Sequence, residues 1–418
     1  MPPPNPGPHH PGQAAATPAA RPERSAHGPL HPLTFELTAR QPQPRAALLS
    51  NWLRLLSGPR FPINPNWIGE TPLVASKALI AALDDKVGDI LTWLGPALAR
   101  RNDADWPLAP AADVLSADLA IVSAPDTEQG WDLRWVEFQT FTSLVSLIYT
   151  LHRAGAELWP ELGERAFWSK PPHGNDWLHA TKAWMAPERG SILLEQDPWS
   201  QPTRADFEAA RHWFGVTVTE PQALRLRAGK LERTDEDGHV HPVPHIANRL
   251  ILHEAAQADA VKRMLSSATV TWHSHPAWYY RINKGVMSDL PLPQDQRCAR
   301  GDRWRDLGLP ASALVAKACQ SYAGKSVLLD PDADALDGLP DPQNWVVQPR
   351  FSSAPLLQAH DGAPLHGEIR CVIALPKDGA EPWIVCRLAR MTRGPMASAN
   401  GWSGLPGEGA VPVYAPPD

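Results

Sequence analysis

The sequence has 418 residues, of which 43% are hydrophobic, and a formal net charge of −6 at pH 7. This length suits two or three domains or one elaborate domain, and the hydrophobic content supports a large core. The negative charge and the lack of basic blocks argue against nucleic acid as a partner. The sequence contains no run of 18 apolar residues, so no membrane-spanning helix is predicted.

The N-terminal end of the chain predicts a tail followed by helices. Residues 1–45 are rich in Pro, Ala, His and Gly. We expect them to be disordered, because they cannot bury enough apolar surface to offset the entropy of ordering. Apolar residues spaced three and four apart predict helices within 46–56 and 71–101. The segments 117–124 and 132–139 predict two strands joined by a polar turn, and 143–159 predicts another helix.

A separate small α/β unit is expected over residues 190–265. Its central helix has Thr203 as a candidate N-cap and Gly215 at its end, which are the residue types that begin and end helices. The expected strands are 191–197, 216–220 and 245–252. This order predicts a βαβ-type arrangement.

The last third of the chain is rich in strand-like segments separated by turns, which predicts an antiparallel sheet. The segments are 312–329, 344–351, 367–375 and 382–390. The four cysteines of the chain form no CxxC pair, and the N-terminus lacks a secretory signal pattern. A reduced, cytoplasmic protein without disulfides or structural zinc is therefore expected.

The segment "WVEFQTF" places a carboxylate where a core side chain is expected. Strand alternation puts Trp135, Glu137 and Gln139 on one face and Val136 and Phe138 on the other. A half-exposed strand explains this pattern. A metal site explains it too, because oxygen-bearing side chains at i and i+2 can bind one hard cation.

Two further segments carry candidate nucleotide contacts. In "LVAKACQSYAGKSVLL", Lys317 ends an apolar strand, and a loop of small residues with Gly324 and Lys325 follows. Lysines and free backbone N–H groups can neutralise and cover phosphates, although a surface hairpin with solvated lysines gives the same pattern. In "NWVVQPRF", Gln348 ends a strand and can meet an adenine edge, or can simply be a polar strand end.

Charged residues alternate with apolar ones in "GEIRCVIAL" and "IVCRLARMTRG". Glu368 and Arg370 fall on one side of the first strand, and Arg387 and Arg390 lie in the second. Such charges require partners or a ligand, and a cross-strand Glu–Arg pair is the simplest partner. Lys284, after an aromatic-rich stretch, can reach a phosphate. His273 and His275 earlier in that stretch lack the further ligands of a metal site.

The order of these segments resembles the ATP-grasp superfamily in its circularly permuted form. The resemblance is to carboxylate–amine ligases typified by the synthetase domain of glutathionylspermidine synthetase, although several segments are more similar to a branch outside that named enzyme. "ADLAIV…LRWVEFQTFTSL" is similar to the metal-binding strands of the group, with Gln139 where the group has Asn. "RINKGVM", "LVAKACQSYAGKSVLL", "NWVVQPRF" and "CRLAR" are similar to its phosphate lysine, strand lysine with lid, adenine hinge and late strand arginine.

The resemblance implies an α+β, ATP-grasp-like fold with a nucleotide cleft between two sheets and a small pre-ATP-grasp-like unit. Residues 46–189 would hold helices and metal-binding strands, 190–265 the small substrate-type domain, and 266–418 the nucleotide-binding portion. Site residues implied or selected are Asp118, Glu137 and Gln139 for metal, Lys284, Lys317, Gly324, Lys325 and Gln348 for nucleotide, and Arg370 and Arg387 for catalysis.

The implied activity is ligation that depends on ATP and Mg²⁺. ATP would phosphorylate a carboxylate, and an amine would attack the resulting acyl phosphate. The expected partners are therefore a small-molecule or peptide acid and an amine, without nucleic acid or membrane. Two alternatives remain open at this point, namely a non-catalytic nucleotide-binding or scaffold protein with the same fold, and a small-molecule kinase.

Overall fold

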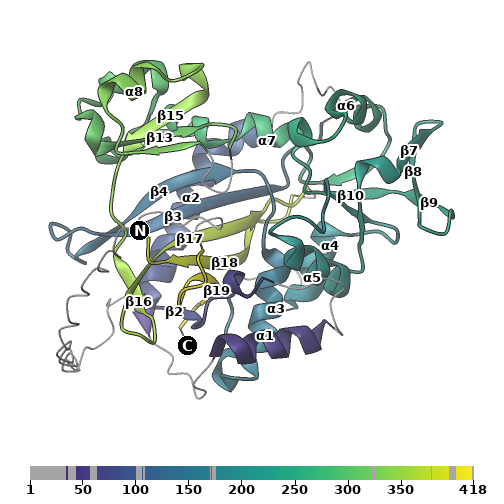
Figure 1. Ribbon diagram of the computed structural model, residues 1–418, viewed down its shortest axis with the longest axis horizontal. Coiled ribbons are helices and arrows are strands. Elements are labelled where there is room, and N and C mark those ends of the chain that lie inside the picture. Colours follow the sequence, from purple (N-terminus) through teal and green to yellow (C-terminus); the bar gives the residue numbers. More distant parts are fainter. Residues whose placement is uncertain are drawn as a thin grey trace, which may run out of the picture.

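An eight-stranded sheet forms the centre of the protein (Figure 1). The computed structural model describes residues 34–35, 44–56, 64–99, 106, 109–169, 171, 176–321, 326–377, 379–394 and 402–416. The strand order of the central sheet is β1-β2-β19-β18-β17-β3-β4, with β16 paired to β17, and only β2 and β19 run parallel. Its strands are β1 (Thr34–Phe35), β2 (Leu73–Ala75), β3 (Val114–Ser123), β4 (Trp131–Gln139), β16 (Pro355–Gln358), β17 (Pro364–Ala374), β18 (Trp383–Thr392) and β19 (Gly409–Tyr414).

One face of the central sheet is covered by the long helix α2 (Lys77–Leu98). Ser76 caps this helix, because its hydroxyl accepts a hydrogen bond from the Leu79 N–H at 3.2 Å. The helix buries a stripe of apolar residues at a spacing of three and four, which pack on alternate residues of β3 and β17. The stripe consists of Leu79, Leu83, Val87, Ile90, Leu94 and Leu98.

The opposite face packs against four helices in a second, aromatic-rich core. Tyr149 and Trp177 stack there with ring centroids 4.5 Å apart. The helices are α1 (Pro44–Leu55), α3 (Val145–Ala156), α4 (Trp177–Met185) and α5 (Arg204–Phe214). Because helices cover both faces, β3 and β18 are buried along almost their whole length.

The N-terminus of α3 is capped by a residue from another helix. Leu144 precedes α3 with a positive φ of 65° and has no capping side chain of its own. Instead, the Asp206 carboxylate of α5 accepts hydrogen bonds from the Leu144 and Leu147 N–H groups, each at 2.9 Å. Arg249 donates to the same carboxylate at 2.7 Å, and both side chains are buried. This arrangement satisfies two N–H groups that a helix N-terminus leaves without an intrahelical partner.

The small α/β unit is a parallel sheet in the order β11-β10-β5-β6, as the βαβ-type pattern predicts. Its strands are β5 (Ile192–Leu194), β6 (Thr217–Thr219), β10 (His245–Asn248) and β11 (Thr271–His273). Helix α5 lies between Thr203 and Gly215 as expected, with Gly215 at a φ of 73°. The unit extends past residue 265, because β11 completes its sheet. Helix α6 (Ala258–Ser266) leads into β11, and a three-stranded sheet is attached, β7 (Leu224–Arg227), β8 (Lys230–Thr234) and β9 (Val240–Val243).

A third layer lies beside the edge strand β4, at the top of Figure 1. It is an antiparallel sheet in the order β12-β15-β13-β14, with its own small core around Trp304 and Leu336. The elements are β12 (Ala299–Arg300), β13 (Leu314–Ala318), β14 (Val327–Leu329), β15 (Trp345–Pro349) and α8 (Ala333–Asp337). The strand-rich last third of the chain is therefore divided, because β17 and β18 belong to the central sheet.

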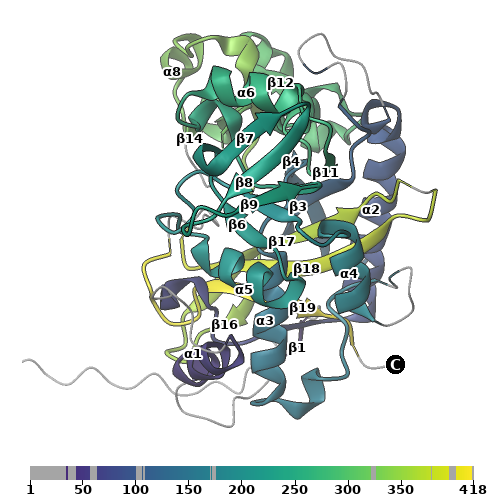
Figure 2. The same cartoon turned by 90° about the vertical axis from the view of Figure 1, so that its right-hand side faces the viewer.

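Short helices complete the fold. Helix α7 (Ala277–Arg281) joins the parallel sheet to the third layer. The 3₁₀ helices are η1 (Pro65–Trp67), η2 (Pro160–Leu162), η3 (Pro221–Ala223), η4 (Leu252–Glu254), η5 (Lys284–Asp289), η6 (Gln294–Gln296), η7 (Gly301–Leu307), η8 (Ala311–Ala313) and η9 (Pro342–Asn344). Figure 2 shows the parallel-sheet unit from its own side, with β7 to β9 in front.

Several predictions made from the sequence can be compared with the fold. The several sheets and helical layers agree with an α+β class. Within the tail expected to be disordered, residues 34–35 form β1, paired with β2, and α1 begins at Pro44. Most of the rest of that tail lies outside the described residues. The four cysteines are buried and free, and among the described helices none has the length and apolar character to cross a membrane.

Candidate active site

The face of the central sheet opposite α2 carries a cluster of charged side chains, called here the charged cluster. Strand β17 lies between β3 and β18, which sets Arg370 opposite Asp118 and Glu368 opposite Arg390. Asp118 in turn faces Glu137 of β4. Two lysines reach the cluster from the third layer and from η5. Its members are Asp118, Glu137, Lys284, Lys317, Glu368, Arg370 and Arg390.

A β-bulge in β4 changes the expected alternation. Asp118 pairs with Glu137 but the next residue of β3, Leu119, pairs with Trp135, so that Val136 is an extra residue. Trp135 and Phe138 consequently share the core face, with ring centroids 4.9 Å apart. The expectation that Trp135 and Glu137 share a face is wrong, whereas Glu137 and Gln139 remain on one half-exposed side.

Lys317 contacts the central sheet at this bulge. An extra residue in a bulge leaves the regular ladder of backbone hydrogen bonds. The Val136 carbonyl accepts a hydrogen bond from Lys317 Nζ at 3.0 Å. Lys317 is buried on β13, so this bond fixes its ammonium beside Glu137. Strand β13 and strand β4, far apart in the sequence, thus meet at one point.

Glu137 is surrounded by cations. Lys284 Nζ lies 3.3 Å from its Oε2, and Arg370 Nη2 lies 3.2 Å from its Oε1. Burial alone would raise the pKa of Glu137, but Lys284, Arg390, Arg370 and Lys317 together hold it far below the usual range. The pKa of Lys317 is lowered, mainly by burial, against the opposing effect of Glu137 and Glu368. These four cations therefore favour the ionised form of Glu137.

Asp118 is the most enclosed member of the cluster, with 1% of its side chain exposed. Arg370 binds it in a bidentate manner, with Nε to Oδ1 and Nη2 to Oδ2 each at 2.6 Å. Arg390 donates to Oδ2 as well. Both oxygens of Asp118 are thus occupied by guanidinium groups, whereas the side chains of Glu137 and Glu368 are 15% and 14% exposed.

Glu368 and Arg390 belong to the charged cluster, although the sequence pattern alone did not predict them as site residues. Glu368 Oε2 accepts a hydrogen bond from Arg390 at 2.6 Å, which is the cross-strand Glu–Arg pair considered above. Burial raises the pKa of Glu368, partly opposed by Arg390. The signal that would have identified Arg390 is its position opposite Glu368 in two antiparallel strands.

The structure does not bring Arg387 to the charged cluster. Arg387 and Arg390 are three residues apart in a strand, so their side chains leave opposite faces of the sheet. Arg387 is buried on the α2 side, where it donates to Asp84 of that helix. It is therefore separated from Arg370 by the sheet itself, and Arg390 is the late strand arginine that faces the cluster.

Of the remaining nucleotide candidates, Lys284 lies in η5 and Gln348 lies in the third layer. Lys284, the first residue of η5, donates to the Ser321 carbonyl as well as approaching Glu137. Gln348 is buried on β15, and its Oε1 atom has no hydrogen-bond partner among the described residues. Gly324 and Lys325 lie outside the described residues, so the structure places neither of them.

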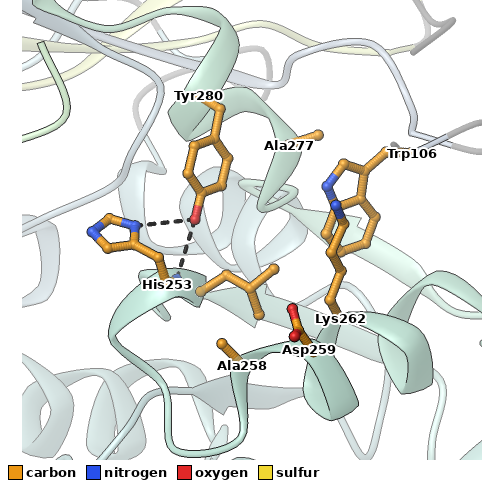
Figure 3. A pocket seen from close by; sticks show the side chains of 8 residues that line it. Trp106, His253, Ala258, Asp259, Lys262, Ala277 and Tyr280 are labelled. Carbon is orange, nitrogen blue, oxygen red and sulfur yellow. Dashed lines mark hydrogen bonds between the residues drawn. The ribbon is translucent and has the colours of Figure 1, made fainter. Parts of the chain in front are cut away.

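Two cavities among the described residues are lined by Trp106 together with residues of the parallel-sheet unit, and neither is lined by the charged cluster. The larger has a volume of ≈ 390 Å³. The smaller has a volume of ≈ 270 Å³, and its lining includes His253 and Ala277, which come after β10 and β11 in the chain (Figure 3). In it the Tyr280 hydroxyl meets the His253 N–H at 3.2 Å and His253 Nδ1 at 3.1 Å, opposite Asp259 and Lys262.

Glu195, at the carboxyl end of β5, provides a pH test of the parallel-sheet unit. Burial raises its pKa from 4.5 to about 7, against the opposing effect of Arg249. The folded state therefore binds a proton more tightly than the unfolded state, and this stabilisation is lost as the pH rises from about 4.5 through 7. We expect Glu195→Gln to be more stable than the wild type at pH 8, by about 1–3 kcal/mol.

The check is urea denaturation of both proteins at pH 5 and pH 8. The difference in unfolding free energy between them should be larger at pH 8. Glu236→Gln, at an exposed position of the β8–β9 hairpin, is the matched control and should leave the pH dependence unchanged. An equal pH dependence for Glu195→Gln and the wild type would refute the raised pKa.

The sequence and the structure were compared with those of known proteins. No family model matches the sequence, and no curated protein matches it. Among solved structures, a glutathione synthetase-like effector (GSS30) from Globodera pallida, in its apo form, is similar. The TM-score is 0.53 at 11% sequence identity, and the match covers 90% of this chain and 98% of that chain. The chain has a glutathione synthetase-like fold.

Proposed function

We propose that this glutathione synthetase-like protein is an ATP- and Mg²⁺-dependent ligase, which activates a carboxylate for attack by an amine. One observation carries the proposal: Glu137 lies between Lys284 and Arg370, with Lys317 bound to the adjacent Val136 carbonyl. A carboxylate among cations at the meeting point of two sheets suits a phosphate chain with its metal ion. The circularly permuted ATP-grasp topology and the nucleotide cleft belong to the same proposal.

The residues present fit ATP and Mg²⁺. Glu137, Gln139 and Glu368 offer oxygen atoms, the ligand type that Mg²⁺ prefers, and few carboxylates are needed when phosphates and water complete its shell. Asp118 fits less well, because both of its oxygens bind arginines. Buried Gln348, whose Oε1 has no hydrogen-bond partner in the described part of the chain, fits the amino group of adenine. When bound, Mg²⁺ would neutralise charge that develops on the transferred phosphoryl group.

The chain's own groups then take distinct roles. Lys284 and Lys317 would neutralise phosphate oxygens, and Arg370 and Arg390 would hold the substrate carboxylate near the transferred phosphoryl group. The acid and the amine are small molecules or peptides. We place the reaction in the cytoplasm, where the four buried cysteines would stay reduced.

The test begins with binding. ATP with Mg²⁺ should raise the melting temperature, and pools of acids and amines should then be screened for ADP release. ADP release that needs both an acid and an amine supports the ligase. Release with one phosphate acceptor alone would indicate a kinase instead. Binding without any turnover would indicate the non-catalytic alternative, which the occupied oxygens of Asp118 favour.

A substitution at Lys317 tests the nucleotide assignment. Lys317→Ala should weaken ATP·Mg²⁺ binding by about tenfold or more, because a buried ammonium would no longer face the phosphates. Calorimetry measures the affinity. Lys230→Ala, at an exposed lysine of β8, is the matched control and should bind ATP like the wild type. Unchanged affinity in the Lys317 variant would remove this lysine from the site.

A further inference from the structure

The turn that follows β4, residues 140–143, is held at every residue. The Thr140 carbonyl accepts a hydrogen bond from the Ser274 hydroxyl at 3.2 Å, and the Phe141 carbonyl accepts one from Ser116 at 3.3 Å. Thr142 Oγ1 lies 2.7 Å from His273 Nε2. Ser143 Oγ accepts from Arg370 Nη1 at 2.8 Å. The turn therefore joins a candidate metal strand to the parallel-sheet unit.

His273 is fixed in place from several elements. It is 1% exposed at the end of β11, and the Trp184 ring of α4 packs edge-on against it at 4.3 Å. Its Nδ1 lies 3.5 Å from Asp113 Oδ2. The tautomer with the proton on Nδ1 directs this N–H towards the carboxylate and leaves Nε2 to accept from the Thr142 hydroxyl.

Asp113 is itself anchored. Its Oδ1 accepts from the Ser274 N–H at 2.9 Å, and Lys377 Nζ lies 3.1 Å from its Oδ2. Ser274 has a φ of 58°, a left-handed conformation that a serine rarely adopts without support. That conformation is what allows Ser274 to meet both Asp113 and the Thr140 carbonyl. A continuous set of contacts thus runs from Lys377 through Asp113 and His273 to the turn.

We propose that Thr142 and His273 are positioning residues for the ligase reaction, an inference that rests on the proposed function. The Thr142–His273 hydrogen bond fixes the turn so that Ser143 holds the third nitrogen of the Arg370 guanidinium. The other two nitrogens bind Asp118, and one of them also binds Glu137. Because a planar guanidinium cannot satisfy all these partners in another orientation, Ser143 and Asp118 together set the orientation of Arg370, which in turn contacts Glu137.

The experiment compares two variants of Thr142. Thr142→Val keeps the shape and removes the hydroxyl, whereas Thr142→Ser keeps the hydroxyl. For Thr142→Val we expect kcat to fall by about tenfold to a hundredfold, the effect of small misplacements in active sites. The KM for ATP should stay within about twofold, because Lys284 and Lys317 are untouched. Thr142→Ser should retain most of the activity, and His273→Gln and Ser143→Ala should resemble Thr142→Val.

A second measurement does not depend on turnover. The Arg370 Nε–H resonance, assigned by nuclear magnetic resonance with Arg370→Lys, should shift in Thr142→Val and stay in place in Thr142→Ser. A wild-type kcat or an unmoved resonance in the folded Thr142→Val protein would overturn the inference. Equal loss in Thr142→Ser and Thr142→Val would also overturn it. Absence of wild-type ADP release contradicts the proposed function alone, and the resonance still tests the positioning.

Discussion

Glu137→Gln should lower ATP turnover by about a hundredfold to a thousandfold while the protein stays folded. The substitution keeps the size of the side chain and removes the charge that faces Lys284 and Arg370. On the proposed function the metal ion would lose a partly exposed carboxylate. Lys284 would lose its ion-pair partner, whereas Arg370 would keep Asp118. Steady-state ADP release measures the effect, and thermal melting confirms folding.

Glu161→Gln changes an exposed glutamate of η2 and should turn over ATP at the wild-type rate. If Glu137→Gln keeps more than about a third of the wild-type rate, Glu137 does not hold the metal ion and the ligase proposal loses its central residue. If it binds ATP·Mg²⁺ normally but does not turn over, Glu137 acts in the chemical step and not in binding.

The second large effect concerns stability. Asp206→Ala should lower the free energy of unfolding by about 3–5 kcal/mol, because it leaves the buried Arg249 guanidinium without its counterion. The N–H groups of Leu144 and Leu147 lose their acceptor at the same time. Urea denaturation measures the loss.

Two further variants separate the causes. Asp176→Ala removes an exposed cap of α4 and should cost only about 1 kcal/mol. Combining Asp206→Ala with Arg249→Met should recover part of the lost stability, since no unpaired charge remains. A loss below about 1.5 kcal/mol for Asp206→Ala would show that water or another group replaces the carboxylate.

Sequence patterns within a segment predicted the helices and strands better than they predicted which strands pair with each other. Gly215 ends α5 with a positive φ, which is a property of a single residue, whereas Thr203 precedes the helix without a side-chain capping hydrogen bond. The small unit extends beyond the predicted boundary at residue 265, because β11 pairs with β10 and belongs to its sheet. This strand was hard to predict, since it is only three residues long. Such a strand carries little periodic signal of its own.

In the candidate site, too, the features that depend on pairing between strands were not predicted from the sequence. The order of motifs predicted that Glu137, Lys284 and Lys317 would meet, and the structure brings them together, although their roles stay predictions. The bulge at Val136 depends on pairing between strands, which the sequence pattern of one strand does not contain. The prediction of Arg387 is wrong for this face of the sheet, because side chains alternate along a strand and Arg390, opposite Glu368, is on the side of the cluster.

The central sheet also has a consequence for protein synthesis. Strands β3 and β4 leave the ribosome early and pair with each other. The second partner of β3 is β17, which follows only after the parallel-sheet unit and the third layer. Until then the nascent hairpin exposes an apolar strand edge, the kind of surface that aggregates. The parallel-sheet unit, whose contacts are more local, can fold first. We therefore expect nascent chains that end before β17 to need a chaperone, and the charged cluster to form only when β18 has been made.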